Sequence, residues 1–189
     1  MKLSSLKQTR KKIAVFGGSF DPFHYGHLAV VKCLARRFDE VWIMPCFRHP
    51  MGKKLTPWED RYKMCVLGAS GLRKVKVSKL EFQLGGESYT IKTLNYLNSN
   101  FPQLHFFWVV GVDAFSYIDR WRDPEKLRKF DFVVISREKK EVPFGKPLIC
   151  KTPKISSSLI RAKIKRGESV ETLLPKKVLE YIMKRKLYL

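Results

Sequence analysis

Apolar runs rich in strand-forming residues alternate along this chain with segments whose apolar residues recur at helical spacing. The strand-like runs are about residues 12–16, 40–44, 75–82, 104–110, 132–135 and 146–150. The helix-like segments are about residues 28–38, 57–69, 89–97, 114–117, 124–130, 156–165 and 175–185. This alternation predicts an α/β fold with a Rossmann-like, doubly wound parallel sheet covered by helices on both faces.

Local signals sharpen two of these predicted helix starts. Thr56 precedes Pro57 and Glu59, a pattern typical of an N-cap threonine with proline in the first turn. Ser88 is in the position to cap the helix expected from residue 89. The run at 104–110 is mostly apolar, which indicates a strand buried on both faces.

Four loops that carry polar or glycine residues follow predicted strands. They are residues 17–27, residues 48–54, residues 111–113 and the segment after Cys150. Because the carboxyl ends of parallel strands meet at one edge of a sheet, we expect these loops to converge there.

The length of 189 residues suits one domain with a real core. We expect a single domain over residues 12–189, preceded by a flexible basic arm over residues 1–11. No apolar run approaches the roughly 18 residues of a membrane span. The first residues also lack the apolar core of a secretory signal.

The net charge of +21 is the unusual bulk property of the chain. It fits nucleic acid, an anionic membrane surface or phosphate-rich substrates as partners. The lysines and arginines are spread along the whole chain, which is more typical of a solvated surface. Charge alone therefore assigns no function.

Four cysteines occur, at positions 33, 46, 65 and 150, and none forms a C-x-x-C pair. Three lie in apolar surroundings, which indicates buried thiols in a reducing compartment and a cytoplasmic location. Such scattered residues do not predict a zinc site.

The most informative stretch is residues 17–27, read G-G-S-F-D-P-F-H-Y-G-H, between the first strand and the first helix. A glycine-rich turn brings backbone N–H groups close to a ligand, and the helix start adds a partial positive charge. This design suits a phosphate chain. The alternatives are an ordinary tight turn with a chance histidine pair, and a zinc-binding H-x-x-H, which lacks further ligands.

Residues 18–27 resemble the nucleotidylyltransferase signature G-x-F-[DN]-P-x-H-x-G-H and match it at every fixed position. The segment is neither the dinucleotide fingerprint nor a P-loop. Residues 155–161, I-S-S-S-L-I-R, resemble the I-S-S-T-x-I-R motif of the same enzymes, with Ser158 in place of threonine. Hydroxyls and free N–H groups at a helix start can hold phosphate oxygens.

Further matches narrow the resemblance to bacterial nicotinate-nucleotide adenylyltransferases. Residues 87–94 look like their S-Y-T-x-x-T-L segment, residues 110–113 look like their G-x-D, and Trp121 stands where they have a tryptophan. The resemblance runs from about residue 12 to the C-terminus. Residues 48–54 depart from the family's P-P-H-K-like loop, so the register of their lysines stays open.

The resemblance implies a nucleotidylyltransferase-type sheet and transfer of AMP from ATP to nicotinate mononucleotide, with Mg²⁺ bound mainly through ATP oxygens. It implies that His24, His27 and Arg161 act in catalysis. The implied ATP-binding residues are Gly17, Gly18, Ser19, Phe20, His24, His27, Ser156, Ser157, Ser158 and Arg161. The implied mononucleotide-binding residues are Ser19, Lys53, Lys54, Tyr89, Thr90, Asp113 and Trp121. Asp21 is expected to order the turn, and no residue is expected to bind a metal directly.

Three alternatives stay open. Nicotinamide mononucleotide, or both mononucleotides, is the first alternative acceptor, and another phosphate such as phosphopantetheine is the second. The third is a nucleic-acid-binding protein with an inactive fold of this type, although the intact histidines and serines disfavour it. Association with further copies of the chain also stays open, and no membrane partner is expected.

Overall fold

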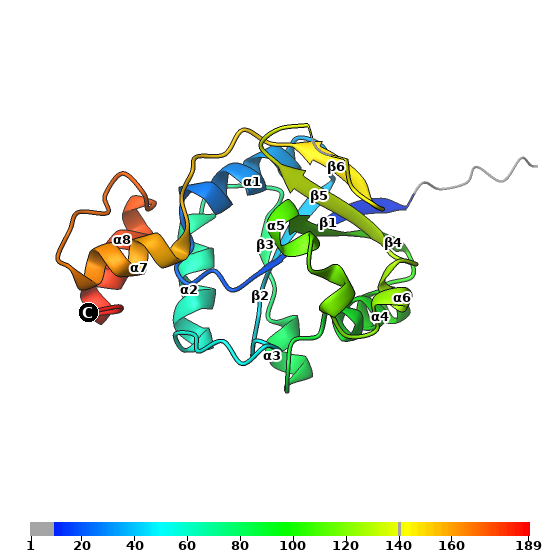
Figure 1. Cartoon of the computed structure of the whole chain (residues 1–189), viewed down its shortest axis with the longest axis horizontal. Coiled ribbons are helices and arrows are strands. Elements are labelled where there is room, and N and C mark those ends of the chain that lie inside the picture. Colours follow the sequence, from blue (N-terminus) through cyan, green and yellow to red (C-terminus); the bar gives the residue numbers. More distant parts are fainter. Residues whose placement is uncertain (1–9, 140) are drawn as a thin grey trace, which may run out of the picture.

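The protein is described by a computed structural model that covers residues 10–139 and 141–189. Its centre is a six-stranded parallel sheet in the order β3-β2-β1-β4-β5-β6 (Figure 1). The strands are β1 Lys11–Gly18, β2 Glu40–Pro45, β3 Val75–Val77, β4 Leu104–Gly111, β5 Asp131–Ser136 and β6 Lys146–Ile149. The predicted α/β fold with a parallel sheet is therefore confirmed.

The predicted N-terminal arm falls mostly outside the described residues. Residues 1–9 lie there, and β1 already begins at Lys11, one residue inside the predicted arm. Lys11 pairs with Leu104 of β4, and its ammonium contacts the Glu40 carboxylate at 2.6 Å. Lys11 therefore belongs to the sheet.

All helices except α3 occupy the expected segments, with shifted ends. They are α1 Tyr25–Ala35, α2 Trp58–Gly68, α3 Leu80–Leu84, α4 Thr90–Asn100, α5 Val112–Phe115, α6 Pro124–Leu127, α7 Ser157–Lys165 and α8 Lys176–Arg185, with a 3₁₀ turn at Ile118–Arg120. The strand predicted over residues 75–82 is wrong beyond Val77. There Ser78 Oγ accepts from the Leu80 N–H at 3.1 Å, and α3 begins.

Both predicted helix caps are wrong. No side chain caps α2 or α4, whose N-cap residues are Pro57 and Tyr89. The Thr56 N–H instead donates to Asp21 Oδ2 at 3.2 Å, and Ser88 Oγ accepts from the Phe47 N–H at 2.8 Å. These polar groups connect loops across the sheet edge rather than start helices.

The four inner strands β2, β1, β4 and β5 are mostly buried on both faces, as their apolar runs predict, whereas the edge strands β3 and β6 are partly exposed. Alternate residues of β1 point to opposite sides, with Ala14 and Phe16 in one core cluster and Ile13 and Val15 in the other. The first cluster includes residues of α1, α2, α7 and α8, and the second includes residues of α4, α5 and α6. In Figure 1, α7 and α8 form one end of the molecule, and α8 packs against α2.

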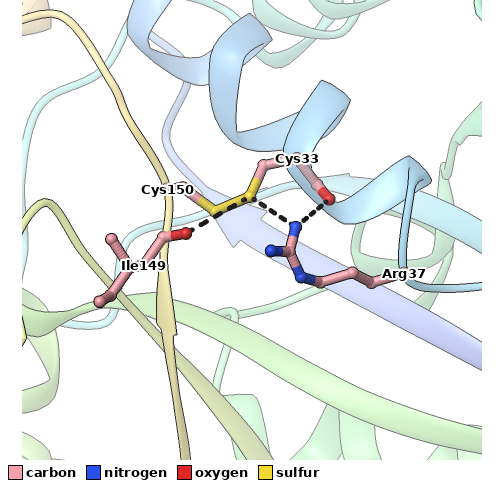
Figure 2. The surroundings of a disulfide bond; sticks show 4 residues. All are labelled: Cys33, Arg37, Ile149 and Cys150. Carbon is pink, nitrogen blue, oxygen red and sulfur yellow. Dashed lines mark hydrogen bonds between the residues drawn. A yellow bond between two sulfur atoms is a disulfide. The ribbon is translucent and has the colours of Figure 1, made fainter.

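The prediction of free thiols is wrong for two of the four cysteines. Cys33 of α1 and Cys150, just after β6, form a disulfide with a Cα–Cα distance of 6.1 Å (Figure 2). Arg37 lies beside it, with Nη1 3.4 Å from Cys33 Sγ and donating to the Cys33 carbonyl at 3.3 Å. Cys46 and Cys65 are buried free thiols, as the sequence predicted.

Candidate active site

The carboxyl end of β1 lies where the strand order reverses. The chain passes from β1 to β2 on one side and later returns to β4 on the other side. In open parallel sheets the crevice at such a reversal is where ligands bind. Two cavities, each of about 570 Å³, open here, and Ser19 lines both of them.

We name the two cavities after one residue in each. The His27 cavity is lined by the signature segment and the serine motif, including Phe20, His24, His27, Ser156, Ser157 and Ser158. The Trp121 cavity is lined by aromatic and basic side chains, including Tyr89, Trp108, Tyr117, Arg120, Trp121 and Arg122. The predicted convergence of loops at one sheet edge is thus confirmed.

His24 and His27 cap the start of α1 reciprocally. The His24 N–H donates to His27 Nδ1 at 3.3 Å, and the His27 N–H donates to His24 Nδ1 at 3.4 Å. The two rings stack with centroids 3.7 Å apart. Because both Nδ1 atoms accept, each neutral ring carries its hydrogen on Nε2.

Burial keeps both imidazoles uncharged at neutral pH. Desolvation lowers the pKa of His24 to about 4. Desolvation also lowers the pKa of His27 well below its usual value, and the neighbouring His24 adds to this effect. The pair therefore offers two N–H donors to an anion rather than two positive charges.

The serine motif reaches the same cavity from the start of α7. Ser156 Oγ caps the helix by accepting from the Leu159 N–H at 3.2 Å. Ser157 Oγ donates to the Pro22 carbonyl at 3.0 Å, which ties α7 to the signature segment. A helix start lined by hydroxyls and free N–H groups is a suitable site for phosphate oxygens.

Asp21 is the centre of a hydrogen-bond network that fixes the signature turn. Only 3% of its surface is exposed. Its carboxylate accepts from the Tyr188 hydroxyl at 2.6 Å and from the Thr56 N–H at 3.2 Å. Its carbonyl accepts from Arg161 Nη1 at 2.7 Å. Asp21 therefore orders the turn, as the sequence suggested.

The Trp121 cavity combines aromatic walls with positive potential. The helix α4 begins there at Thr90 without a side-chain cap. The Lys92 N–H donates to the Tyr89 carbonyl at 3.0 Å, whereas the N–H groups of Thr90 and Ile91 have no hydrogen-bond partner among the described residues. The guanidinium of Arg122 lies 5.5 Å from the centre of the Tyr89 ring, and Arg120 also lines the cavity. A flat ring that carries a negative substituent suits this arrangement.

Several predicted site residues do not line the cavity that their predicted role implies. Lys53 and Asp113 line the His27 cavity rather than the Trp121 cavity. Gly17 and Gly18 line the Trp121 cavity. A Cβ on Gly17 would lie 2.5 Å from the Trp108 ring, so only glycine fits there. Lys54 and Arg161 line neither cavity. The roles of all these residues stay predictions.

Sequence reasoning missed two buried charged residues at the site. Arg61 of α2 is 1% exposed and donates to the main-chain carbonyls of Ser19, just after β1, and Cys46, just after β2. Glu81 of α3 lines the Trp121 cavity and accepts from Thr93 Oγ1 at 3.0 Å, and burial raises its pKa. Neither belongs to a recognisable motif, and Glu81 fell within a segment predicted to be a strand.

Comparisons with known proteins agree with this geometry. Residues 15–163 match the family described as cytidylyltransferase-like. A protein of Anaeromyxobacter dehalogenans (strain 2CP-C), named "Probable nicotinate-nucleotide adenylyltransferase", is 39% identical over 94% of this chain and 97% of its own length. A protein of the same name from Leifsonia xyli subsp. xyli is 36% identical, with 96% of each chain covered.

A solved structure has the same fold. The nicotinic acid mononucleotide adenylyltransferase of Plasmodium falciparum, complexed with NaAD, superposes with a TM-score of 0.78. The match covers 94% of this chain and 97% of that one at 24% identity. The sequence relatives, the matched family and the shared fold agree, and the chain belongs to the nicotinate-nucleotide adenylyltransferase family within the cytidylyltransferase-like proteins.

Proposed function

We propose that this protein transfers the adenylyl group of ATP to nicotinate mononucleotide, forming deamido-NAD and pyrophosphate. The observation that carries the proposal is the pair of cavities that meet at Ser19. One cavity offers hydrogen-bond donors to a polyphosphate, and the other offers aromatic walls and a positive helix start to a pyridine carboxylate. A reaction between two nucleotides needs both sites side by side.

On the ATP side, we assign His24, His27 and Ser156–Ser158 to the phosphates. The Nε2–H groups of the histidines donate to the α-phosphate region, where negative charge develops during attack. The start of α7 binds the outer phosphates. Arg161 joins them only after exchanging its bond to the Asp21 carbonyl for a phosphate oxygen.

Mg²⁺ fits the His27 cavity as a partner of ATP. Across residues 10–139 and 141–189, no three His, Cys, Asp or Glu side chains come together as metal ligands. Mg²⁺ commonly keeps several waters and binds through substrate phosphates with one or two carboxylates. Asp113 and Glu138 line this cavity and would supply those carboxylates, which replaces the expectation that no residue binds the metal directly. The ion would neutralise the triphosphate charge.

On the acceptor side, Trp121 stacks on the pyridine ring and the start of α4 at Tyr89–Thr90 binds its carboxylate. The uncapped helix start together with Arg120 and Arg122 favours the acid over the amide. Glu81, at the same cavity, acts in the opposite direction when ionised, and its raised pKa weakens that effect. Nicotinamide mononucleotide is therefore the second candidate acceptor.

Direct in-line attack requires no general base here. The second pKa of a phosphate monoester is about 6, so the mononucleotide phosphate is mostly a dianion at pH 7. It attacks the α-phosphorus, the bond to the bridging oxygen breaks, and pyrophosphate leaves with that electron pair. The protein then has to align the two nucleotides and stabilise charge, without a covalent intermediate.

We also propose a cytoplasmic location, where ATP is made and used. Disulfides are rare in that compartment outside hyperthermophiles. We therefore expect the Cys33–Cys150 pair to be a dithiol in a reducing cytoplasm. The measurement is a count of alkylated cysteines in protein trapped directly in cells. Across the two described ranges, no helix is both long and apolar enough to cross a membrane.

The test is pyrophosphate release from Mg-ATP with nicotinate or nicotinamide mononucleotide in parallel. We expect a strong preference for the acid. Equal rates, or preference for the amide, would keep the chemistry but refute the carboxylate site at α4. Release with neither mononucleotide would refute the proposed function.

A further inference from the structure

Arg61 has an unusual set of partners for a buried cation. All four of its hydrogen-bond acceptors are main-chain carbonyl oxygens. Nε donates to Thr56 at 2.8 Å, Nη1 donates to Cys46 at 2.7 Å and to Ser19 at 3.0 Å, and Nη2 donates to Phe47 at 3.2 Å. The described residues include no carboxylate in a salt bridge with Arg61. The carboxyl groups of Asp21 and Glu81 act on it only at longer range.

Such a group is costly to keep inside a fold. Burying a charge is unfavourable unless hydrogen bonds replace water, and arginine stays protonated even where desolvation lowers its pKa. Loops could be packed more cheaply with apolar side chains. A guanidinium at this place has the advantage that its rigid, planar donors fix several carbonyls at defined angles.

The carbonyls that Arg61 holds belong to the loops that line the two cavities. Ser19 lines both cavities, and Cys46 lines the Trp121 cavity. Cys46 and Phe47 begin the loop after β2, and Thr56 ends it; His49 of this loop lines the Trp121 cavity and Lys53 lines the His27 cavity. One side chain thus joins the signature segment to both ends of the loop that contacts both cavities.

We propose that Arg61 is a positioning residue for adenylyl transfer, which fixes the distance and orientation between the two bound nucleotides. The inference rests on the proposed function, because it needs two nucleotides that react across Ser19. Arg61 touches neither cavity itself. Its loss should therefore leave each substrate bound and misalign the pair, and a misplacement of about 1 Å can lower a rate about 100-fold.

The test uses Arg61→Lys, which keeps the charge but offers a single nitrogen that cannot span four carbonyls. We expect kcat for pyrophosphate release to fall about 100-fold, with the KM for Mg-ATP and for nicotinate mononucleotide changed less than about fivefold. In Arg61→Ala, added methylguanidinium should restore part of kcat. Turnover is expressed per folded molecule, measured below the unfolding temperature of each variant.

Arg185→Lys is the matched control. Arg185 also binds a buried partner of α2, Asp60, at 3.2 Å, but it reaches neither loop. It should change stability without lowering kcat.

Three outcomes would overturn the inference. A wild-type kcat in folded Arg61→Lys would show that the residue is only structural or acts only through its charge. A raised KM with unchanged kcat would assign it to binding. An inactive wild-type enzyme would instead refute the proposed function, and the positioning role with it.

Discussion

Tyr188 is one of three side chains through which the C-terminal part of the fold holds the signature turn, together with Ser157 and Arg161. Its hydroxyl donates to Asp21 Oδ1 at 2.6 Å, and burial next to that carboxylate raises the pKa of Tyr188. Substitution Tyr188→Phe removes the hydroxyl and keeps the ring. Asp21 Oδ1 then loses this partner, whereas Oδ2 keeps the Thr56 N–H.

The size of the effect follows from the burial of Asp21. A hydrogen bond to a charged group contributes about 1.5–3 kcal/mol, so we expect the free energy of unfolding to fall by about 2 kcal/mol. For a chain of this size, Tm should fall by about 4–8 °C. If half of that free energy is lost from the signature turn, to which we assign ATP binding, the KM for ATP rises about fivefold.

Urea unfolding gives the free energy of unfolding, and pyrophosphate release at varied ATP concentration gives the KM for ATP. Tyr181→Phe is the matched control, because the Tyr181 hydroxyl donates to buried Asp60 at 2.7 Å, away from the signature turn. Asp60 keeps Arg185 as a partner, so we expect a smaller loss of stability and an unchanged KM. If Tyr188→Phe matches wild type in both measurements, the network around Asp21 does not support the turn and the reasoning is wrong.

Three further outcomes are expected. His27→Ala should lower kcat about 100- to 1000-fold with an unchanged circular dichroism spectrum, since a donor to the developing charge is lost; a rate within tenfold of wild type would exclude that role. The pKa of His24 is 6.5 in the unfolded chain and about 4 in the folded protein. Between pH 7 and pH 5 this histidine therefore takes up a proton only when the chain unfolds, so acidification over this range should lower the free energy of unfolding by about 2 kcal/mol. A urea midpoint that does not move over this range would contradict the buried neutral ring. The Cys33–Cys150 disulfide spans 117 residues, so its reduction should lower the free energy of unfolding by roughly 2–5 kcal/mol. Cys33→Ser should show the same loss without reductant. Equal urea midpoints for the oxidised protein, the reduced protein and Cys33→Ser would argue against the disulfide.

The histidine pair that we propose for phosphate binding could be found from the sequence because its hydrogen bonds are local. The reciprocal caps of His24 and His27 lie within four consecutive residues at one helix start, so the motif itself contains both partners. The buried strands could also be predicted from the sequence, since continuous apolar runs are typical of strands covered on both faces.

The parts that sequence reasoning missed depend on partners far away in the chain. Ser19 lies 42 residues before Arg61 and accepts through its carbonyl, a group that every residue has and that no sequence pattern marks. Thr56 and Ser88 have the right chemistry for helix caps, but loops across the sheet edge compete for their polar groups. The pairing of Cys33 with Cys150 needed the fold before it could be recognised.

The bond between Tyr188 and Asp21 also has a consequence for the time course of synthesis. Ribosomes make proteins from the N-terminus, and early segments begin to fold while later ones are still being added. Asp21 is made 167 residues before the hydroxyl that completes its hydrogen bonds. The growing chain can therefore form β1 early, yet the signature turn stays unfinished until Tyr188 has emerged from the ribosome. If this turn binds ATP as we propose, nascent chains should bind ATP more weakly than the finished protein does.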